Sequence, residues 1–268
     1  MKELLQLTIS ASIEAGKAIL NVYKLAAIEV EYKDDSTPLT HADRASNDII
    51  DKYLSTTNIP MLSEEDSRTH DFSTRKTWDK CWIVDPLDGT KEFIKRNGEF
   101  TVNIALAEKG HPILGVIYTP VQDVLHFAAE GIGSFRIDKA SEIKSPEDFF
   151  VLAKQLPLQL PPATFTIVGS RSHASPETDA FVEEQRKKFS EVDFVAAGSS
   201  LKFCLIAEGK AHVYPRFAPT MEWDTAAGQV IVEQAGGTFV EWPSQKAFVY
   251  NREELRNNWF LVEAKKSK

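Results

Sequence analysis

Hydrophobic positions near the N-terminus follow a helical spacing, then a strand spacing, then a helical spacing again. Between residues 3 and 24, apolar side chains recur every three or four positions, which predicts an amphipathic helix. Residues 28–32 alternate apolar and acidic side chains, as a half-buried strand does. A second helix is predicted to begin at Thr40, because Thr40 and Asp43 have the spacing of a capping box. Taken alone, Asp43 is better explained by capping than by catalysis.

Beyond residue 100, the pattern changes from consecutive strands to alternating strands and helices. A mainly antiparallel meander is predicted by apolar or alternating segments at 101–107, 112–118, 124–128 and 134–137. Residues 140–163 are rich in Lys, Glu and Pro, which interrupt regular structure. Strands then alternate with helices: we expect strands at 165–168, 192–196, 212–214, 238–241 and 259–263, and helices at 176–189, 201–208 and 225–234. The chain is therefore predicted to comprise an N-terminal α+β lobe (1–140), a linker (141–163) and a C-terminal α/β lobe (164–268).

Composition and charge exclude several classes of protein. The 268 residues are 43% hydrophobic and 26% charged, which is ordinary for a globular protein. The formal net charge of −8 argues against a binder of nucleic-acid polymers, which usually carries a basic face. Cys81 and Cys204 both lie in apolar runs, so we expect buried free thiols. A signal-peptide pattern and a stretch of about twenty apolar residues are both lacking, which predicts a cytoplasmic protein without a transmembrane segment.

One apolar run ends in an unusual group of polar residues. Cys81–Val84 predicts a buried strand, and Asp85 would fall at its carboxyl end, where α/β sheets collect ligands. Pro86 restricts the backbone, so we expect the two neighbouring carboxylates, Asp85 and Asp88, to be held in place. Together with the Leu87 carbonyl between them, they offer oxygen ligands to a hard cation such as Mg²⁺.

Gly89 and Thr90 complete this motif. Gly89 has no Cβ, so a ligand can approach its backbone closely, and Thr90 offers a hydroxyl beside it. Asp-Gly is also an ordinary turn signal, and Pro-x-Asp-Gly is a common turn composition. On this motif alone, a turn and a metal site explain the residues equally well.

Two further acidic segments are candidates for the same cluster. Glu64 lies in the charged segment Ser63–Asp66, which follows a short apolar run; such a run of charges is usually a solvated loop. Asp224 precedes the helix predicted at 225–234 and is a natural N-cap for it. One carboxylate oxygen can cap a helix while the other faces outward, so capping and metal binding are compatible.

These acidic elements stand in a definite order along the chain: Glu64–Glu65, then Asp-Pro-Leu-Asp-Gly-Thr at 85–90, then Trp-Asp-Thr-Ala-Ala-Gly at 223–228. The ordered set resembles the inositol monophosphatase superfamily of Mg²⁺-dependent, lithium-sensitive phosphatases, and the resemblance covers nearly the whole chain. It implies an α/β (α+β) fold, the αβαβα layered sandwich of the inositol monophosphatase and fructose-1,6-bisphosphatase type. It also implies two or three Mg²⁺ ions in the active site.

The resemblance assigns metal ligands to matching residues. Glu64, Asp85 and the Leu87 carbonyl would bind the first metal. Asp85 would bridge to a second metal, which Asp88 and Asp224 complete. The chain departs from the family pattern at Leu87, where isoleucine is commoner, and at residue 63, where serine replaces glycine. Neither departure changes a ligand atom.

The resemblance also assigns catalytic residues. Thr90 and Asp43 would orient and activate the attacking water. Glu64 is also assigned as a catalytic residue. Thr90 can accept a proton from the water and pass its own proton to Asp43, so Asp43 would act as a general base through Thr90.

Several segments of the second half resemble the 3′(2′),5′-bisphosphate nucleotidase branch of the superfamily: Gly169–His173, Ala197–Lys202, Tyr214–Arg216 and Pro219–Asp224. By this resemblance the substrate would contact Ser170, His173, Gly198, Lys202, Arg216, Glu64, Asp85, Pro86, Leu87, Asp88, Gly89, Thr90 and Asp224. A second substrate phosphate would be recognised by fixed cations such as Lys202 and an arginine. The alternative is that Lys202 and Arg216 are exposed solubilising charges and that His173 caps the next helix.

The function implied by this branch is removal of the 3′-phosphate of adenosine 3′,5′-bisphosphate, which gives AMP and phosphate. The sulfated relative of that nucleotide is a further expected substrate. Two alternatives stay open: an inositol monophosphatase, and a nucleotide-binding regulatory protein that has lost its activity. A peripheral position on the cytoplasmic side of the inner membrane is suggested by the resemblance alone.

Overall fold

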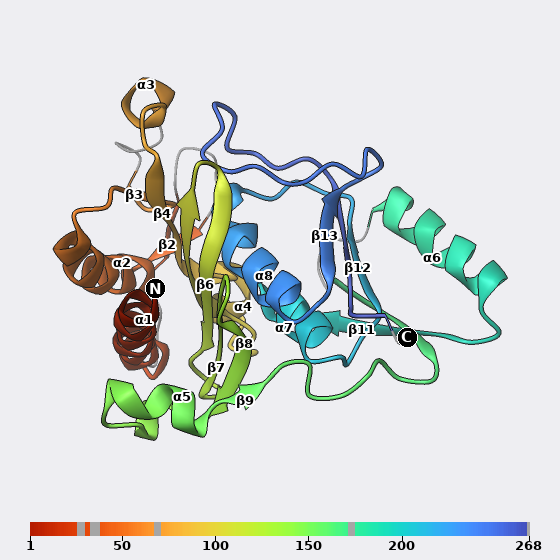
Figure 1. Cartoon of the computed structure of the whole chain (residues 1–268), viewed down its shortest axis with the longest axis horizontal. Coiled ribbons are helices and arrows are strands. Elements are labelled where there is room, and N and C mark those ends of the chain that lie inside the picture. Colours follow the sequence, from red (N-terminus) through yellow and green to blue (C-terminus); the bar gives the residue numbers. More distant parts are fainter. Residues whose placement is uncertain (26–29, 33–37, 67–70, 171–174, 267–268) are drawn as a thin grey trace.

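Layers of helices and layers of sheet alternate through the molecule (Figure 1). The computed structural model describes residues 1–25, 30–32, 38–66, 71–170 and 175–266. The long helices are α1 (Lys2–Tyr23), α2 (His41–Leu54), α6 (Pro176–Lys188), α7 (Leu201–Ala207) and α8 (Glu222–Gln234). In order, the layers are α1 with α2, a seven-stranded sheet, α7 with α8, a five-stranded sheet, and α6. The predicted αβαβα sandwich is therefore confirmed.

The seven-stranded sheet has the order β3-β4-β5-β6-β7-β8-β9. Its strands are β3 (Met61–Ser63), β4 (Lys80–Asp88), β5 (Thr101–Glu108), β6 (His111–Thr119), β7 (Val124–Ala129), β8 (Gly133–Asp138) and β9 (Lys154–Gln155). Each neighbouring pair from β4 to β9 is antiparallel, which confirms the predicted meander. Residues 141–163, which we predicted as a linker, supply β9 to this sheet.

The five-stranded sheet has the order β11-β10-β12-β14-β13. Its strands are β10 (Phe165–Ser170), β11 (Val192–Ala197), β12 (Val213–Arg216), β13 (Thr238–Glu241) and β14 (Phe260–Glu263). β10 is parallel to β11 and β12, because α6 and α7 form the crossover connections, whereas β14 is antiparallel to both of its neighbours. The carboxyl ends of the parallel strands share one edge of the sheet, and the loop Gly198–Ser200 leaves β11 at that edge.

Short elements connect these layers: β1 (Val30–Tyr32), β2 (Pro38–Thr40), η1 (Ser55–Thr57), α3 (Phe72–Arg75), α4 (Thr90–Ile94), η3 (Ala140–Glu142), η4 (Pro146–Asp148) and α5 (Phe149–Leu152). The strand predicted at 28–32 is confirmed for residues 30–32, and its first two residues lie outside the described part of the chain. Cys81 and Cys204 are buried free thiols, as predicted. Among the described residues, no helix is both long enough and apolar enough to cross a bilayer.

Three apolar clusters hold the layers together. One packs α1 and α2 on the seven-stranded sheet and includes Ile9 and Trp82. A second surrounds α7 and α8, and joins Ile83 of the first sheet to Val230 of α8 and Phe260 of the second sheet. Ten of the thirteen residues of α8 are buried, because a helix between two sheets has little solvent face.

Strand β4 does not end at Asp85, as we predicted, but continues to Asp88. Asp85 pairs with Asn103 and Asp88 with Thr101, so β4 has one residue more than β5 in this interval. Residues three apart in a regular strand point to opposite faces, but one extra residue brings both carboxylates to the same side. Pro86 suits this irregular segment because it has no amide hydrogen for the ladder.

Residues 67–77 are polar, which predicts a loop, but the described part of this segment contains the short helix α3. Arg75 at the end of α3 is fully buried, and its guanidinium donates hydrogen bonds to the Asn251 side chain and to the carbonyls of Arg252 and Glu253. The prediction was wrong here because these partners are distant in sequence, so no local pattern indicates that the segment is held in place.

Gly115→Ala is expected to lower the free energy of unfolding by about 1–3 kcal/mol, the usual cost of overpacking. A Cβ at Gly115 of β6 would lie 2.5 Å from the carbonyl oxygen of Ala227 in α8, and backbone cannot move aside cheaply. Urea unfolding followed by circular dichroism measures the change. Gly169→Ala is the matched control, since its Cβ would meet the ring of Phe194, a side chain that is 46% exposed and can swing away. Equal losses in both variants would contradict this account.

Candidate functional site

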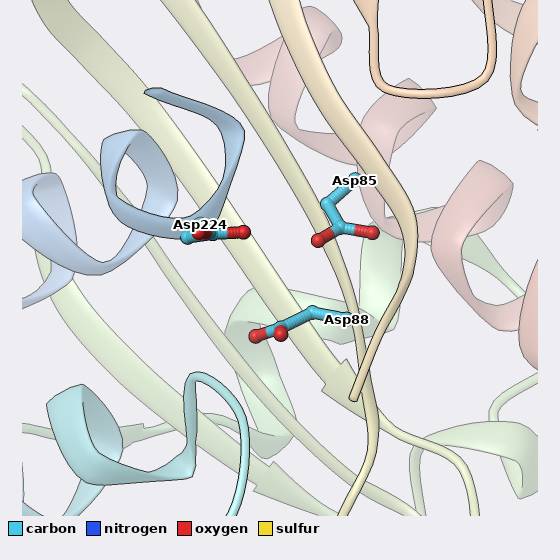
Figure 2. A group of neighbouring side chains, drawn as sticks. All are labelled: Asp85, Asp88 and Asp224. Atoms are coloured by element: carbon cyan, nitrogen blue, oxygen red, sulfur yellow. The ribbon is translucent and has the colours of Figure 1, made fainter. Parts of the chain in front are cut away.

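Three carboxylates from two distant parts of the chain converge between the sheets. Asp85, Asp88 and Asp224 each offer a carboxylate oxygen, and these atoms lie within 4.8 Å of one another. Figure 2 shows Asp85 and Asp88 projecting from the end of β4 toward Asp224 at the start of α8. The bulge in β4 and the position of α8 between the sheets are the two features that bring the three groups together.

Asp224 is held by its own helix, but not in the way we predicted. Helix α8 begins at Glu222 rather than at residue 225, so Met221 is its N-cap and Asp224 is its third residue. The Asp224 Oδ2 accepts a hydrogen bond from the Met221 amide at 2.7 Å, which is the return half of a capping box. One oxygen of the Asp224 carboxylate therefore caps the helix, while the carboxylate still faces Asp85 and Asp88.

Burial and mutual repulsion dominate the electrostatics of the cluster. Asp85 is 1% exposed, and burial raises its pKa well above the ordinary value, with the charges of Glu64 and Asp88 adding to the effect. Burial also raises the pKa of Asp224 to about 8, and the charge of Asp88 contributes. Burial and like charge thus disfavour the ionised forms of Asp85 and Asp224, and a positive charge at the cluster would favour them.

Glu64 stands beside this group, immediately after β3. Its backbone amide donates to the Val84 carbonyl of β4 at 3.1 Å, which fixes the chain next to Asp85. The charge of Glu64 raises the pKa values of Asp43, Asp85 and Asp224, so all of these groups lie within its electrostatic reach. Glu64 does not belong to the tight group of Asp85, Asp88 and Asp224 that the described residues form.

Thr90 and Asp43 meet at the first turn of α2. The Thr90 Oγ1 donates to Asp43 Oδ1 at 3.3 Å and lies 3.4 Å from the Leu87 carbonyl oxygen. The other carboxylate oxygen of Asp43 accepts from the Thr40 amide at 2.8 Å and from the Thr40 hydroxyl at 2.6 Å, which confirms the predicted capping box. Burial raises the pKa of Asp43. Capping thus fixes the carboxylate that faces Thr90.

The backbone between these residues is fixed as well. The Pro86 carbonyl accepts a hydrogen bond from the Ser46 hydroxyl of α2 at 2.7 Å, and the Leu87 amide donates to Asp85 Oδ1 at 3.1 Å. Gly89 has a φ of +92°, which an L side chain rarely adopts, so glycine is needed for the turn from β4 into α4. The two interpretations of this motif, a turn and a cluster of carboxylates, therefore both hold: the segment forms a turn, and the same turn places the carboxylates.

The predicted substrate contacts of the second half lie in several places. Ser170 ends β10, whereas His173 lies outside the described residues. The amide of Gly198 donates to Glu99 Oε2 at 2.8 Å, and the Arg216 guanidinium donates to the Pro219 carbonyl at 3.1 Å. Which of these residues contact a substrate stays a prediction.

Lys202 is not the exposed, solubilising charge that we considered as an alternative. Its side chain is buried, with 6% of the residue exposed, and its ammonium donates to the carbonyls of Ala197 and Ser199. The alternative of an exposed lysine is therefore wrong.

Sequence reasoning missed three groups that contact Asp88. Its Oδ2 accepts hydrogen bonds from Ser199 Oγ at 2.6 Å, Ser200 Oγ at 2.8 Å and Asn103 Nδ2 at 3.3 Å. The only local signal is a Gly-Ser-Ser turn after a predicted strand, which is also an ordinary loop composition.

The donor set suits a hard divalent cation. Every candidate ligand atom is oxygen, and each carboxylate has one oxygen held by the protein: Asp85 by the Leu87 amide, Asp88 by the serines, and Asp224 by the Met221 amide. Within the described residues, no hydrogen bond takes the second oxygen of these carboxylates. Oxygen ligands with unbalanced negative charge favour Mg²⁺, Mn²⁺ or Ca²⁺ over softer metals.

Comparison with known sequences gives a consistent result over the whole chain. The sequence model described as "Inositol monophosphatase family" matches residues 1–266. The 3′(2′),5′-bisphosphate nucleotidase CysQ of Escherichia coli K12 is 44% identical over 253 residues, covering 92% of this chain and 94% of the relative. The protein of the same name from Haemophilus influenzae is 31% identical and covers 97% of this chain and 93% of its own.

Comparison with solved structures agrees. CysQ from Bacteroides thetaiotaomicron, described as a bacterial member of the inositol monophosphatase family, superposes with a TM-score of 0.91 at 44% identity, over 100% of this chain and 99% of that one. An inositol monophosphatase from Thermotoga maritima superposes with a TM-score of 0.74 at 20% identity, over 97% of this chain and 92% of that one. At this lower identity, the second match supports the fold alone.

In the presence of a chelator, the thermal midpoint is expected to fall as pH rises from about 4 to above 8. The folded protein retains protons on Asp85 and Asp224 to higher pH than the unfolded chain does, because their pKa values are raised above 3.8, the ordinary value of an aspartate. The contribution of these two protonated carboxylates to the free energy of unfolding is complete below pH 3.8 and is lost as pH rises through about 8. Thermal unfolding across this range tests the effect. Asp224→Asn should flatten the pH dependence, and an unchanged slope in this variant would contradict the assignment.

Proposed function

This chain belongs to the inositol monophosphatase family, and we propose that it is a Mg²⁺-dependent 3′(2′),5′-bisphosphate nucleotidase, a phosphoric monoester hydrolase. Its proposed reaction converts adenosine 3′,5′-bisphosphate into AMP and phosphate, and the sulfated analogue of that nucleotide is a second proposed substrate. The main support is the 44% identity to nucleotidases of this kind over 92% of the chain. The convergence of Asp85, Asp88 and Asp224 supplies the chemistry that such a reaction requires.

The proposed cofactor is Mg²⁺, with two or three ions in the site. Glu64, Asp85 and the Leu87 carbonyl are the proposed ligands of one ion, and Asp85, Asp88 and Asp224 those of another. When bound, Mg²⁺ neutralises the phosphoryl oxygens and lowers the pKa of water. The protein contributes the fixed geometry, because one oxygen of each aspartate is occupied by a hydrogen-bond donor from the protein.

Thr90 and Asp43 are proposed to move the proton of the attacking water. The water oxygen forms a bond to phosphorus while the bond from phosphorus to the 3′ oxygen breaks, and the 3′ oxygen leaves with the bonding electrons and takes up a proton. Thr90 Oγ1 accepts the proton of the water and passes its own to Asp43 Oδ1, over a separation of 3.3 Å. Burial raises the pKa of Asp43, which makes this carboxylate a stronger base than an exposed aspartate.

We propose that residues 1–140 form the metal-binding catalytic lobe and that residues 164–268 contribute Asp224 and nucleotide recognition. Ser170, His173, Gly198, Lys202 and Arg216 are the proposed nucleotide contacts. Arg216 has support from its surroundings, since its buried Nε has no hydrogen-bond partner among the described residues and is available to an anionic ligand. A cytoplasmic location is part of the proposal, because buried free thiols suit a reducing compartment.

Phosphate release from adenosine 3′,5′-bisphosphate and from inositol 1-phosphate, each with Mg²⁺ and with a chelator, tests the proposal. We expect kcat/KM to be higher for the nucleotide and activity to disappear in the chelator. Faster hydrolysis of inositol 1-phosphate would favour an inositol monophosphatase instead. Tight nucleotide binding without phosphate release would favour a regulatory protein.

Asp85→Asn is expected to lower kcat/KM at least about 100-fold, because a bound metal contributes several kcal/mol to the transition state and each tenfold corresponds to 1.36 kcal/mol. The buried carboxylate should be replaceable by an amide without loss of the fold, which circular dichroism checks. Asp193→Asn, at an exposed position of β11, is the matched control and should retain full activity. Normal turnover in Asp85→Asn would refute the proposed metal ligand.

A further inference from the structure

The connection between β13 and β14, residues 242–259, runs from the five-stranded sheet toward the start of α8, the helix that carries Asp224 (Figure 1). The amide of Glu222, the first residue of α8, donates to the carbonyl of Leu255 in this connection at 3.0 Å. The amide of Tyr250 donates to the Gly110 carbonyl, in the turn between β5 and β6, at 2.9 Å. The connection therefore contacts both the helix and the seven-stranded sheet.

Asn257 of this connection holds the backbone around Asp224. Its Nδ2 lies 2.7 Å from the Met221 carbonyl oxygen, 3.0 Å from Thr225 Oγ1 and 3.1 Å from Thr220 Oγ1. Its own amide donates to the Thr220 carbonyl at 2.8 Å. These partners lie before and after Asp224 in the sequence, so one side chain, on a residue that is 7% exposed, fixes the chain on both sides of the carboxylate.

Glu222 binds the same connection through its side chain. The residue is fully buried, and its carboxylate accepts hydrogen bonds from the amides of Asn251 and Arg252 at 2.6 and 3.1 Å, and from Arg252 Nε at 3.1 Å. A buried carboxylate is costly unless it is hydrogen-bonded, and here its bonds go to this connection. Arg252 Nη2 also donates to Asn257 Oδ1 at 2.9 Å, which leaves the Nδ2 of Asn257 for the start of α8.

Arg75 of α3 holds the other backbone groups of the same segment. Its guanidinium is fully buried and donates to the carbonyls of Arg252 and Glu253, and the Asn251 side-chain amide donates back to the Arg75 carbonyl at 2.9 Å. The donors of a guanidinium have fixed directions, so several such bonds define the backbone of residues 251–253 closely. Arg75 lies between β3 and β4, so these contacts join the N-terminal half of the chain to the start of α8.

The start of α8 needs this support because its local sequence provides little. Met221 is the N-cap residue, and a methionine side chain has no oxygen to accept the helix amides. Asp224 instead uses one of its own oxygens for the Met221 amide, at 2.7 Å. The direction of the other oxygen then follows the backbone of residues 221–224. A misplacement of about 1 Å at a reacting centre can cost about 100-fold in rate, so this backbone has to be fixed.

From these contacts we propose that Asn257 and Arg75 are positioning residues for the metal ligand Asp224. Asn257 fixes the backbone on both sides of Asp224, and Arg75 fixes the connection that carries Asn257. The inference rests on the proposed function, because it takes Asp224 as a metal ligand. Both residues act through Asp224 and not on the metal itself.

This role differs in a measurable way from a contribution to stability alone. Contacts that only stabilise the fold lower the thermal midpoint when they are removed, but the folded variant binds metal as the wild type does. Contacts that position Asp224 affect metal binding by the folded protein, even without substrate. They also raise the Mg²⁺ concentration that gives half-maximal activity.

Asn257→Ala is the sharpest test, because it changes no charge near the carboxylates. Titration calorimetry with Mn²⁺ as the probe, without substrate, is expected to show binding weakened by about tenfold to a hundredfold, as is usual when a group that orients a metal ligand is removed. Asn258→Ala is the matched control: it removes the same group from the next residue, which is exposed and donates to Glu241 at 3.0 Å. Mn²⁺ affinity within twofold of the wild type in a folded Asn257→Ala protein would overturn the inference.

Arg75→Lys tests the other end of the contacts and keeps the positive charge. Lysine cannot reproduce the several fixed bonds of the guanidinium, so we expect Mn²⁺ binding more than twofold weaker than in the wild type, with a native circular dichroism spectrum. Arg186→Lys, at an exposed ion pair with Glu183 on α6, is the matched control. If Asn257→Ala does not fold, this variant decides: wild-type Mn²⁺ affinity in folded Arg75→Lys, or loss of the fold in both variants, would overturn the inference.

The wild type separates the failure of this inference from that of the proposed function. If the wild-type protein binds no Mn²⁺ and releases no phosphate, the proposed function fails, and the positioning role fails with it. If the wild type binds Mn²⁺ and hydrolyses the bisphosphate while the folded variants match its Mn²⁺ affinity, only the positioning role fails.

Discussion

Repulsion among one buried and two partly buried carboxylates is the constraint around which this molecule is built. Asp85, Asp88 and Asp224 place oxygen atoms within 4.8 Å of one another, and burial raises the pKa values of Asp85 and Asp224. Such a group persists only because fixed donors hold one oxygen of each carboxylate while the second is left for a cation. The same unbalanced charge that lowers the stability of the metal-free protein therefore prepares the site for a divalent ion.

The layered fold supplies the rigidity that this arrangement needs. Helix α8 is buried between the two sheets, so the position of Asp224 relative to β4 is set by the packing of both. The seven-stranded sheet is also joined to the helical layer by polar contacts: Glu208, just after α7, accepts hydrogen bonds from His126 of β7 and Arg136 of β8, at 2.7 and 2.9 Å. A site assembled from both lobes is thereby held to fixed distances, as catalysis by positioned charges requires.

Where the prediction from sequence failed, the reason was a contact between distant residues. The end of β4 was placed too early because the bulge depends on pairing with β5, and α8 was started too late because Met221, an unusual cap, is fixed by a bridge to Arg256. The helix α3 was missed because its buried Arg75 is bonded to residues 251–253. The serines that hold Asp88 were missed for the same reason, since their partner lies on the other sheet.

Local pattern was enough to identify the long helices and most of the strands, including the antiparallel meander. It also identified the capping of α2 by Thr40 and Asp43, and the acidic residues that a resemblance could then assign to a metal. Hydrophobic periodicity and capping act over a few residues, so they can be read directly from the chain. Packing decided that Asp224 faces Asp85 and Asp88, that Lys202 is buried and that Ser199 and Ser200 hold Asp88. These contacts depend on the packing of two sheets and the helices between them, which is stabilised by many individually weak van der Waals contacts. Those contacts join residues that are distant in sequence, so no short segment of sequence predicts them.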